Sequence, residues 1–187
     1  MANRNTQGFG LIPAGTLGST PATSGQGKYK IDAGYGTTIY NGGAVASDAG
    51  YIIDGQGTDT PILGVLNGIF YNAATTLKPT FSNFYKTPIT PANSEDIDAF
   101  VFDNPQQQYV VAIDGALAQS GYLETYDMNA SAGNDSTGRS TSTLDNDDTS
   151  ADAASWRLLR SAEDPENDEN AAFRSVVVVA NLIELQS

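Results

Sequence analysis

The 187-residue sequence contains no cysteine and no histidine. Without cysteine the chain has no disulfide bonds, no thiolate zinc sites and no cysteine nucleophile. Without histidine it lacks the usual general base near neutral pH and the commonest metal ligand, which disfavours an enzyme. There is also no Gly-Lys-Ser or Gly-Lys-Thr, so a phosphate-cradling loop of that type is excluded. We therefore predict a protein that is not an enzyme and carries no cofactor.

Long apolar runs are missing as well. None approaches the roughly 20 residues that a membrane-spanning helix needs. The first residues lead into glycine and proline instead of the apolar segment of a signal peptide. We expect no membrane partner, and synthesis in the cytoplasm without an export signal.

Basic residues are scarce, with 9 Lys and Arg against 22 Asp and Glu, giving a net charge of −13. Residues 1–95 hold five of each sign, so the whole excess lies in residues 96–187, with four arginines and seventeen acidic residues. An acidic surface repels phosphate backbones, so we expect no nucleic-acid partner. The acidic half is best interpreted as a solvated surface, and the neutral half is better suited to lying against another protein.

Residues 98–114 contain the clearest strand signals. Two β-branched and aromatic runs, 99–102 and 109–113, flank the turn-forming residues 103–106. This pattern predicts a hairpin at the centre of the fold. The hairpin residues that we expect in the core are Phe100, Phe102, Tyr109, Val111 and Ile113.

Further short strands separated by turn signals predict an all-β fold, a compact β-sandwich or β-barrel of short antiparallel strands with long polar loops. Residues 61–71 predict a bent core strand, and residues 156–160 another strand. Four valines at 176–179 indicate a strand covered on both faces. Only residues 117–128 have helical character. Residues 129–155 predict a long polar loop.

Residues 1–27 are rich in Gly, Thr, Ser and Pro and have too little apolar surface to fold alone. They are either a disordered terminus or an extended arm that becomes ordered on a neighbouring subunit. The apolar anchors of such an arm are Phe9, Leu11, Ile12 and Leu17. The predicted organisation is therefore an N-terminal arm over residues 1–27 and a β domain over residues 28–187.

Two clusters of carboxylates offer the hard oxygen ligands that calcium prefers. Neither has the spacing of an EF-hand, so solvated acidic loops are the favoured interpretation and we predict no metal site. The candidate ligands are Asp145, Asp147 and Asp148 in the first cluster and Asp164, Glu166 and Asp168 in the second. Trp156 and the tyrosines could form a sugar-binding platform, but aromatic residues on short strands are more often part of a core.

Several short segments follow one another in a characteristic order along the chain. They are residues 5–13 (NTQGFGLIP), 99–105 (AFVFDNP), 109–115 (YVVAIDG), 136–140 (STGRS) followed by Leu144-Asp145, and the valine-rich last strand. Together they resemble the small decoration (cement) proteins of tailed bacteriophage heads, especially those of marine and cyanobacterial phages. The sequence departs from that pattern at Gly10-Leu11, where an Arg-Pro-like continuation is expected.

The resemblance implies a structural virion protein on the outer surface of the capsid, which clamps neighbouring major capsid proteins against internal pressure. Its partner would be the major capsid protein. We expect a homo-oligomer, with a trimer favoured and a dimer next, because closed cyclic symmetry is the usual way such subunits assemble. The alternative is a carbohydrate- or receptor-binding β module on a virion fibre or spike.

Overall fold

The structure is a computed structural model that describes residues 5–18, 25–55, 61–129, 133–150, 154–168 and 170–186. These residues form short strands and three single-turn 3₁₀ helices, so the predicted all-β class is confirmed. The strands are β1 (Ile12–Thr16), β2 (Gly27–Ile31), β3 (Ala44–Asp48), β4 (Tyr51–Asp54), β5 (Gly64–Asn72), β6 (Pro79–Ser82), β7 (Ile97–Phe102), β8 (Gln107–Ile113), β9 (Thr125–Met128), β10 (Gly133–Asn134), β11 (Arg139–Ser140), β12 (Leu144–Ser150), β13 (Trp156–Ser161) and β14 (Arg174–Ala180). The 3₁₀ helices are η1 (Ala92–Ser94), η2 (Gln119–Gly121) and η3 (Glu184–Gln186).

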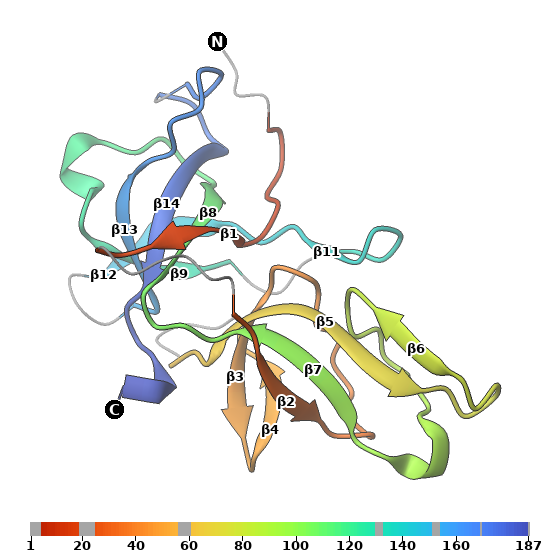
Figure 1. The fold of residues 1–187 in the computed structure, drawn as a ribbon. Helices are drawn as coiled ribbons and strands as arrows, with labels where there is room; N and C mark the ends of the chain where they lie inside the picture. The colour runs from red at the N-terminus through yellow and green to blue at the C-terminus, as the bar shows by residue number, and fades with distance from the viewer. Residues whose placement is uncertain are drawn as a thin grey trace.

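Five strands close into a barrel in the order β8-β12-β9-β13-β14, with β14 pairing back to β8 (Figure 1). β1 adds to the barrel along β8. The ladders are antiparallel except between β8 and β12, where Ile113 pairs with Leu144 in a parallel arrangement. Of the two predicted architectures, a barrel therefore describes this half of the molecule.

The second sheet has the order β2-β7-β5-β3-β4, and β6 pairs with the outer end of β5. Its two end strands, β2 and β4, also contact each other. The amide of Asp54 on β4 donates to the hydroxyl of Tyr35, just beyond β2, at 2.8 Å. The sheet therefore curls around a core of its own, beside the barrel (Figure 1).

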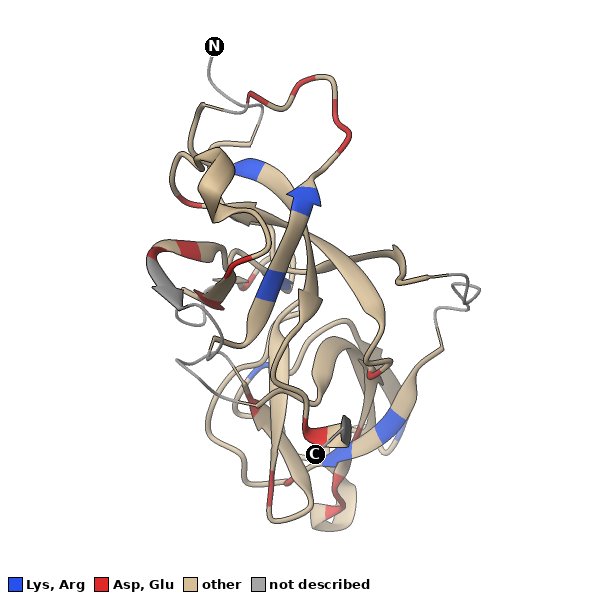
Figure 2. Cartoon of the chain, turned by 90° about the vertical axis from the view of Figure 1, so that its left-hand side faces the viewer, with Lys and Arg blue, Asp and Glu red and all other residues tan. Residues whose placement is uncertain are grey.

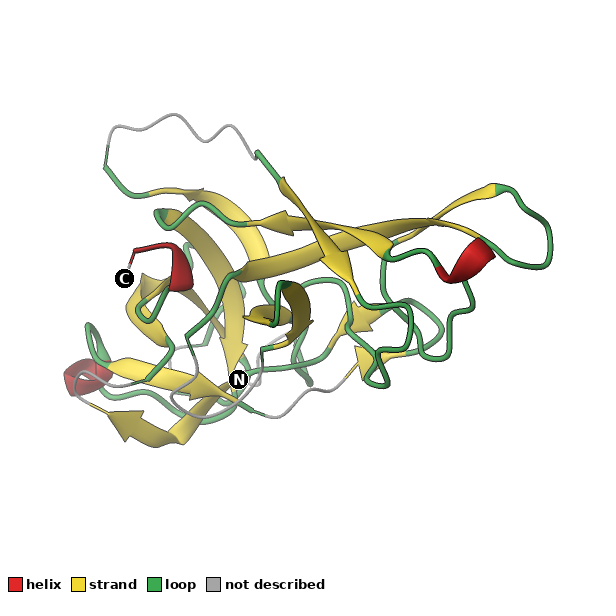
Figure 3. Cartoon of the chain, turned by 90° about the horizontal axis from the view of Figure 1, so that it is seen from below, coloured by secondary structure: helices red, strands yellow, loops and turns green. Residues whose placement is uncertain are grey.

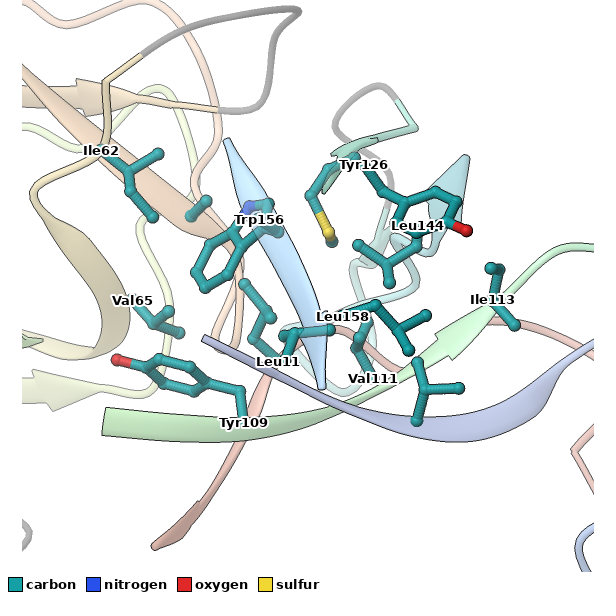
Figure 4. Packing of buried hydrophobic residues seen from close by; sticks show 14 residues of the cluster. Leu11, Ile62, Val65, Tyr109, Val111, Ile113, Tyr126, Leu144, Trp156 and Leu158 are labelled. Atoms are coloured by element: carbon teal, nitrogen blue, oxygen red, sulfur yellow. The ribbon is translucent and has the colours of Figure 1, made fainter. Parts of the chain in front are cut away.

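Each half has a buried apolar cluster. The barrel core is centred on Trp156 and Tyr109 and also takes Ile62 and Val65 from the connection into β5 and from β5 itself (Figure 4). The second core includes Ile31, Ile69 and Ile97. All four valines at 176–179 are buried, which confirms the prediction of a strand covered on both faces.

The two halves are also joined by the β10–β11 hairpin. Asp135, in the turn of this hairpin, accepts a hydrogen bond from the Tyr40 hydroxyl at 2.8 Å. Its carboxylate also forms an ion pair with Lys86 at 3.0 Å. The Tyr40 ring stacks on Phe84, with 5.9 Å between centroids. The hairpin thus packs against the second half of the molecule.

The predicted central hairpin is wrong. The turn exists, since Gln107 N–H donates to the carbonyl of Asn104 at 2.9 Å. However, β7 is already paired on both edges, with β2 and β5, so β8 cannot add to it. The chain instead passes from one sheet to the other at this turn. Tyr109, Val111 and Ile113 are buried as predicted, whereas Phe100 and Phe102 are only half-buried.

The predicted helix at 117–128 is also wrong. It contains only the turn η2 and then β9, whose four residues are all buried in the barrel wall. A barrel strand needs extended backbone, which residues 125–128 adopt. Leu123 has a φ of 68°, which no residue inside a right-handed helix adopts.

The prediction of a long loop at 129–155 is wrong within the described residues, because β10, β11 and β12 lie there. β12 is polar yet closes the barrel. Leu144 pairs with Met128 of β9, and the next paired residue, Thr149, is opposite Tyr126, so five residues along β12 match two along β9. The residues between them bulge out of the ladder, and among the β12 side chains that the structure describes only Leu144 belongs to the barrel core.

The prediction of a separate arm over residues 1–27 is wrong for residues 8–17. β1 pairs with β8, and Leu11 is a buried member of the barrel core. A Cβ on Gly8 would lie 2.0 Å from the carbonyl oxygen of Thr141, so this glycine permits close contact with the body. Residues 1–4 and 19–24 of the predicted arm lie outside the described residues.

Candidate binding surface

The outer face of the second sheet carries three aromatic rings, of which Phe81 is exposed and Phe70 and Phe100 are half-buried. Along β7 the side chains alternate, with Ile97, Ala99 and Val101 buried in the core and their neighbours on the opposite face. Residues paired directly across antiparallel strands share a face. The register therefore groups six side chains on the outer face, which we name the aromatic face: Lys28, Lys30, Phe70, Phe81, Asp98 and Phe100.

Phe81 is the most exposed ring of this face, with 63% of its surface open to solvent. Its centroid lies 6.4 Å from that of Phe100. A Cβ on Gly68 would lie 2.8 Å from the tip of the Phe81 ring, so the ring covers bare backbone at this point of β5. Aromatic residues are among the side chains that most often supply binding energy in protein interfaces.

Two lysines and one carboxylate form the polar part of the aromatic face. Lys28 and Lys30 lie 2.7 Å and 2.6 Å from the Asp98 carboxylate oxygens. Burial by itself would raise the pKa of Asp98, but hydrogen bonds from both ammonium groups outweigh it and lower the pKa below the ordinary value of 3.8. The same hydrogen bond raises the pKa of Lys30. The group keeps one net positive charge on a strongly acidic chain.

We expect Asp98→Asn to destabilise the protein at neutral pH by about 1 kcal/mol or less, because both lysines are half-exposed and solvent screens the pair. The pKa of Asp98 is lowered, so its contribution is present above 3.8 and is lost as the pH falls through the lower folded value. The difference in unfolding free energy between wild type and variant should therefore shrink on acidification. Denaturant unfolding of both proteins across the acidic range measures it. A difference that is constant with pH would contradict the ion-pair explanation.

A cleft of about 480 Å³ adjoins the aromatic face and shares Lys30, Phe70 and Asp98 with it. Its other side is the loop around η1, including Asp96, whose carboxylate accepts a hydrogen bond from the Tyr51 hydroxyl at 3.2 Å. Charge repulsion from Asp96, together with this hydrogen bond, raises the pKa of Tyr51. The cleft is a polar hollow with an aromatic side, at the edge of the aromatic face.

The four predicted arm anchors do not form a binding strip. Leu11 is buried in the barrel, and Phe9 and Leu17 are half-buried. The backbone N–H of Leu17 donates to the carbonyl of Gln106 at 2.9 Å. Ile12 alone is an exposed large apolar side chain. The docking role predicted for these residues is therefore wrong for Leu11.

The acidic candidates lie in two separate places. Asp145 and Asp147 belong to β12, and Asp164, Glu166 and Asp168 follow β13; the side chain of Asp148 is outside the described residues. Asp145 and Asp164 each accept a hydrogen bond from the backbone N–H two residues on, at 2.9 and 3.0 Å, as in turns. In the described part of the chain, no three His, Cys, Asp or Glu side chains gather where they could hold a metal ion.

Trp156 lies in the barrel core with 1% of its surface exposed, so it is not a sugar-binding platform. The structure instead identifies the aromatic face, which the sequence reasoning missed. Its signal was the strict alternation in IDAFVF, which places Phe100 opposite Val101. The hairpin prediction placed Phe100 in the core instead.

Acidic residues occupy mainly the loops, while several of the basic residues lie on strands (Figure 2). Across the described ranges, no helix is long and apolar enough to cross a membrane. In comparisons with known proteins, no family model, curated protein or solved structure matches this chain.

Proposed function

We propose that this chain is a structural virion protein that binds the outside of a tailed-phage capsid and stabilises it by clamping neighbouring major capsid proteins. The observation that carries the proposal is the aromatic face, with Phe81 exposed beside Phe100 and two lysines next to them. Such a face favours adhesion to another protein surface. The motif order that resembles decoration proteins supplies the identity of the partner.

In this proposal the aromatic face replaces the N-terminal arm as the main contact. Each contact of this size is weak on its own, and joining several in a homo-oligomer raises the overall affinity through effective concentration. A trimer remains the favoured assembly and a dimer the next. The acidic barrel then faces solvent, where its charge keeps the particle surface soluble.

The test is binding of the purified full chain to expanded, DNA-free heads of the phage that encodes it. We expect saturable binding and a raised melting temperature of the heads. Phe81→Ser should weaken binding about tenfold or more, because an exposed ring that becomes buried in an interface contributes about 1.5–3 kcal/mol. Leu185→Ser, which alters an exposed apolar residue outside the aromatic face, is the matched control. If Phe81→Ser and Leu185→Ser both bound heads as tightly as wild type, the assignment of the face would be contradicted.

The second candidate function is a carbohydrate-binding module, and the cleft favours it. Phe70 lies in its lining beside Asn72 and Asp96, a combination of a ring and hydrogen-bonding groups that suits a sugar. A glycan array probed with the full chain separates the two functions. Hits that are lost in Asn72→Ala, together with no binding to heads, would favour the carbohydrate module.

A further inference from the structure

The β5–β6 hairpin runs out from the second sheet to the edge of the molecule farthest from the barrel (Figures 1 and 3). Residues 73–78 form its tip, where the N–H of Leu77 donates to the carbonyl of Ala73 at 2.8 Å and closes one turn. Leu77 is 71% exposed, and Phe81 lies four residues further along the same hairpin. The outermost part of the molecule therefore carries two exposed apolar side chains.

Leucine is an unexpected residue at this position. Leu77 has a φ of 53°, the left-handed conformation that side chains with a Cβ disfavour. It closes a turn at the place where glycine, or next asparagine, is preferred. Glycine or asparagine would relieve the backbone and leave no apolar side chain in water, so neither local structure nor solubility favours leucine here. The position of Leu77 at the outermost tip of the hairpin, near the exposed Phe81, makes a contact outside the chain a physical reason to have it.

The neighbouring charge indicates what such a contact looks like. Lys78 follows Leu77, and its ammonium group has no ion-pair partner among the described residues. A pocket that takes the leucine side chain would therefore meet this cation at its rim. Carboxylates at that rim would complement the charge.

We propose that Leu77 is an anchor residue that enters an apolar pocket, rimmed by carboxylates, on the surface of the partner protein. The inference rests on the proposed function and adds the chemistry of the partner. A protein pocket is favoured over a lipid surface, because one leucine beside one cation gives little lipid affinity and the net charge of −13 opposes anionic membranes.

The experiment uses Leu77→Asn in the full chain, with Leu123→Asn as the matched control. Leu123 is also an exposed leucine in the left-handed conformation, with a φ of 68° and 63% exposure, but it lies beside the barrel strand β9. Both variants should unfold at the same denaturant concentration as wild type or a higher one, since asparagine tolerates this conformation better. We expect Leu77→Asn to lose about ten- to a hundredfold in affinity for DNA-free heads, and Leu123→Asn to bind like wild type.

The outcomes separate the two proposals. If wild type binds heads and both variants bind equally well, the anchor is overturned and the proposed function stands. If wild type does not bind heads, both fail. Retention of wild type on vesicles containing anionic lipid, lost in Leu77→Asn, would overturn the protein pocket. If wild type self-associates with rising concentration and Leu77→Asn does not, the pocket lies on a second copy of this chain, and the proposal of a different partner protein is overturned.

Discussion

We expect Leu11→Ala to lower the free energy of unfolding by about 2–5 kcal/mol, the usual cost of a leucine-to-alanine change in a packed core. Leu11 is only 2% exposed and belongs to the barrel cluster with Tyr109 and Leu158 (Figure 4). Its backbone N–H also donates to the carbonyl of Gly42 at 2.8 Å. The removed atoms would leave a cavity between β1 and the barrel wall. Denaturant unfolding followed by circular dichroism measures the change.

The adjacent residue supplies the control. Ile12 is 39% exposed, so Ile12→Ala should cost much less, within about 1 kcal/mol. The contrast tests whether the N-terminal segment belongs to the fold of its own chain. If Leu11→Ala left stability unchanged but abolished binding to heads, the segment would be an arm that docks on a neighbour.

This expectation changes how the N-terminal segment can be tested. A separate arm over residues 1–27 implies that its removal leaves the β domain folded. The structure implies instead that truncation removes β1 and the Leu11 side chain from the barrel, so the remaining chain is destabilised. Loss of head binding by the truncated chain would then report misfolding as much as a lost contact. Point variants of the aromatic face avoid this problem.

The features of the fold that sequence predicted are those fixed by local chemistry. The four valines at 176–179 predicted a strand covered on both faces, and all four are buried. Glycines in 61–71 predicted a bent strand with close backbone approach. β5 is irregular between Leu66 and Gly68, and a Cβ on Gly64 would lie 2.2 Å from the carbonyl oxygen of Phe102.

The errors arose where pairing depends on distant segments. The turn at 103–106 was correctly located, but no local signal shows that both edges of β7 are taken by β2 and β5. The sequence of β12 resembles a loop because nearly all of its residues are polar, and its pairing with β9 and β8 makes it a strand. Leu11 resembled an exposed anchor because nothing nearby in sequence covers it.

The candidate surface was hidden for a related reason. Phe100 and Val101 have similar apolar character, and their positions on opposite faces follow from the alternation of β7, which the hairpin interpretation overlooked. The place of Phe81 on this face follows from the pairing of β6 with β5, which lays its ring over Gly68. The left-handed conformation of Leu77 leaves no signal in the sequence, because leucine rarely adopts it.

Trp156→Ala should be the most disruptive single change, with a loss of about 3–5 kcal/mol in the free energy of unfolding. Trp156 is 1% exposed at the start of β13, and its ring meets that of Tyr109 edge-on, with 5.6 Å between centroids and 89° between planes. Burial raises the pKa of Tyr109, and its hydroxyl donates to the carbonyl of Phe102 at 3.1 Å. Losing the indole would therefore disturb the place where the barrel meets the second sheet.

Trp156→Phe is the matched variant, because it keeps an aromatic ring against Tyr109. It should lose less than half of the unfolding free energy that Trp156→Ala loses. The chain has a single tryptophan, so its tryptophan fluorescence reports this site alone. We expect emission typical of a buried indole, shifting to that of an exposed one in the same transition that circular dichroism detects, and insensitive to added sugars. An exposed spectrum in the folded protein, with little cost for Trp156→Ala, would place the ring on the surface and restore the sugar-platform interpretation. Coincident transitions would instead show that the barrel core and the backbone unfold together.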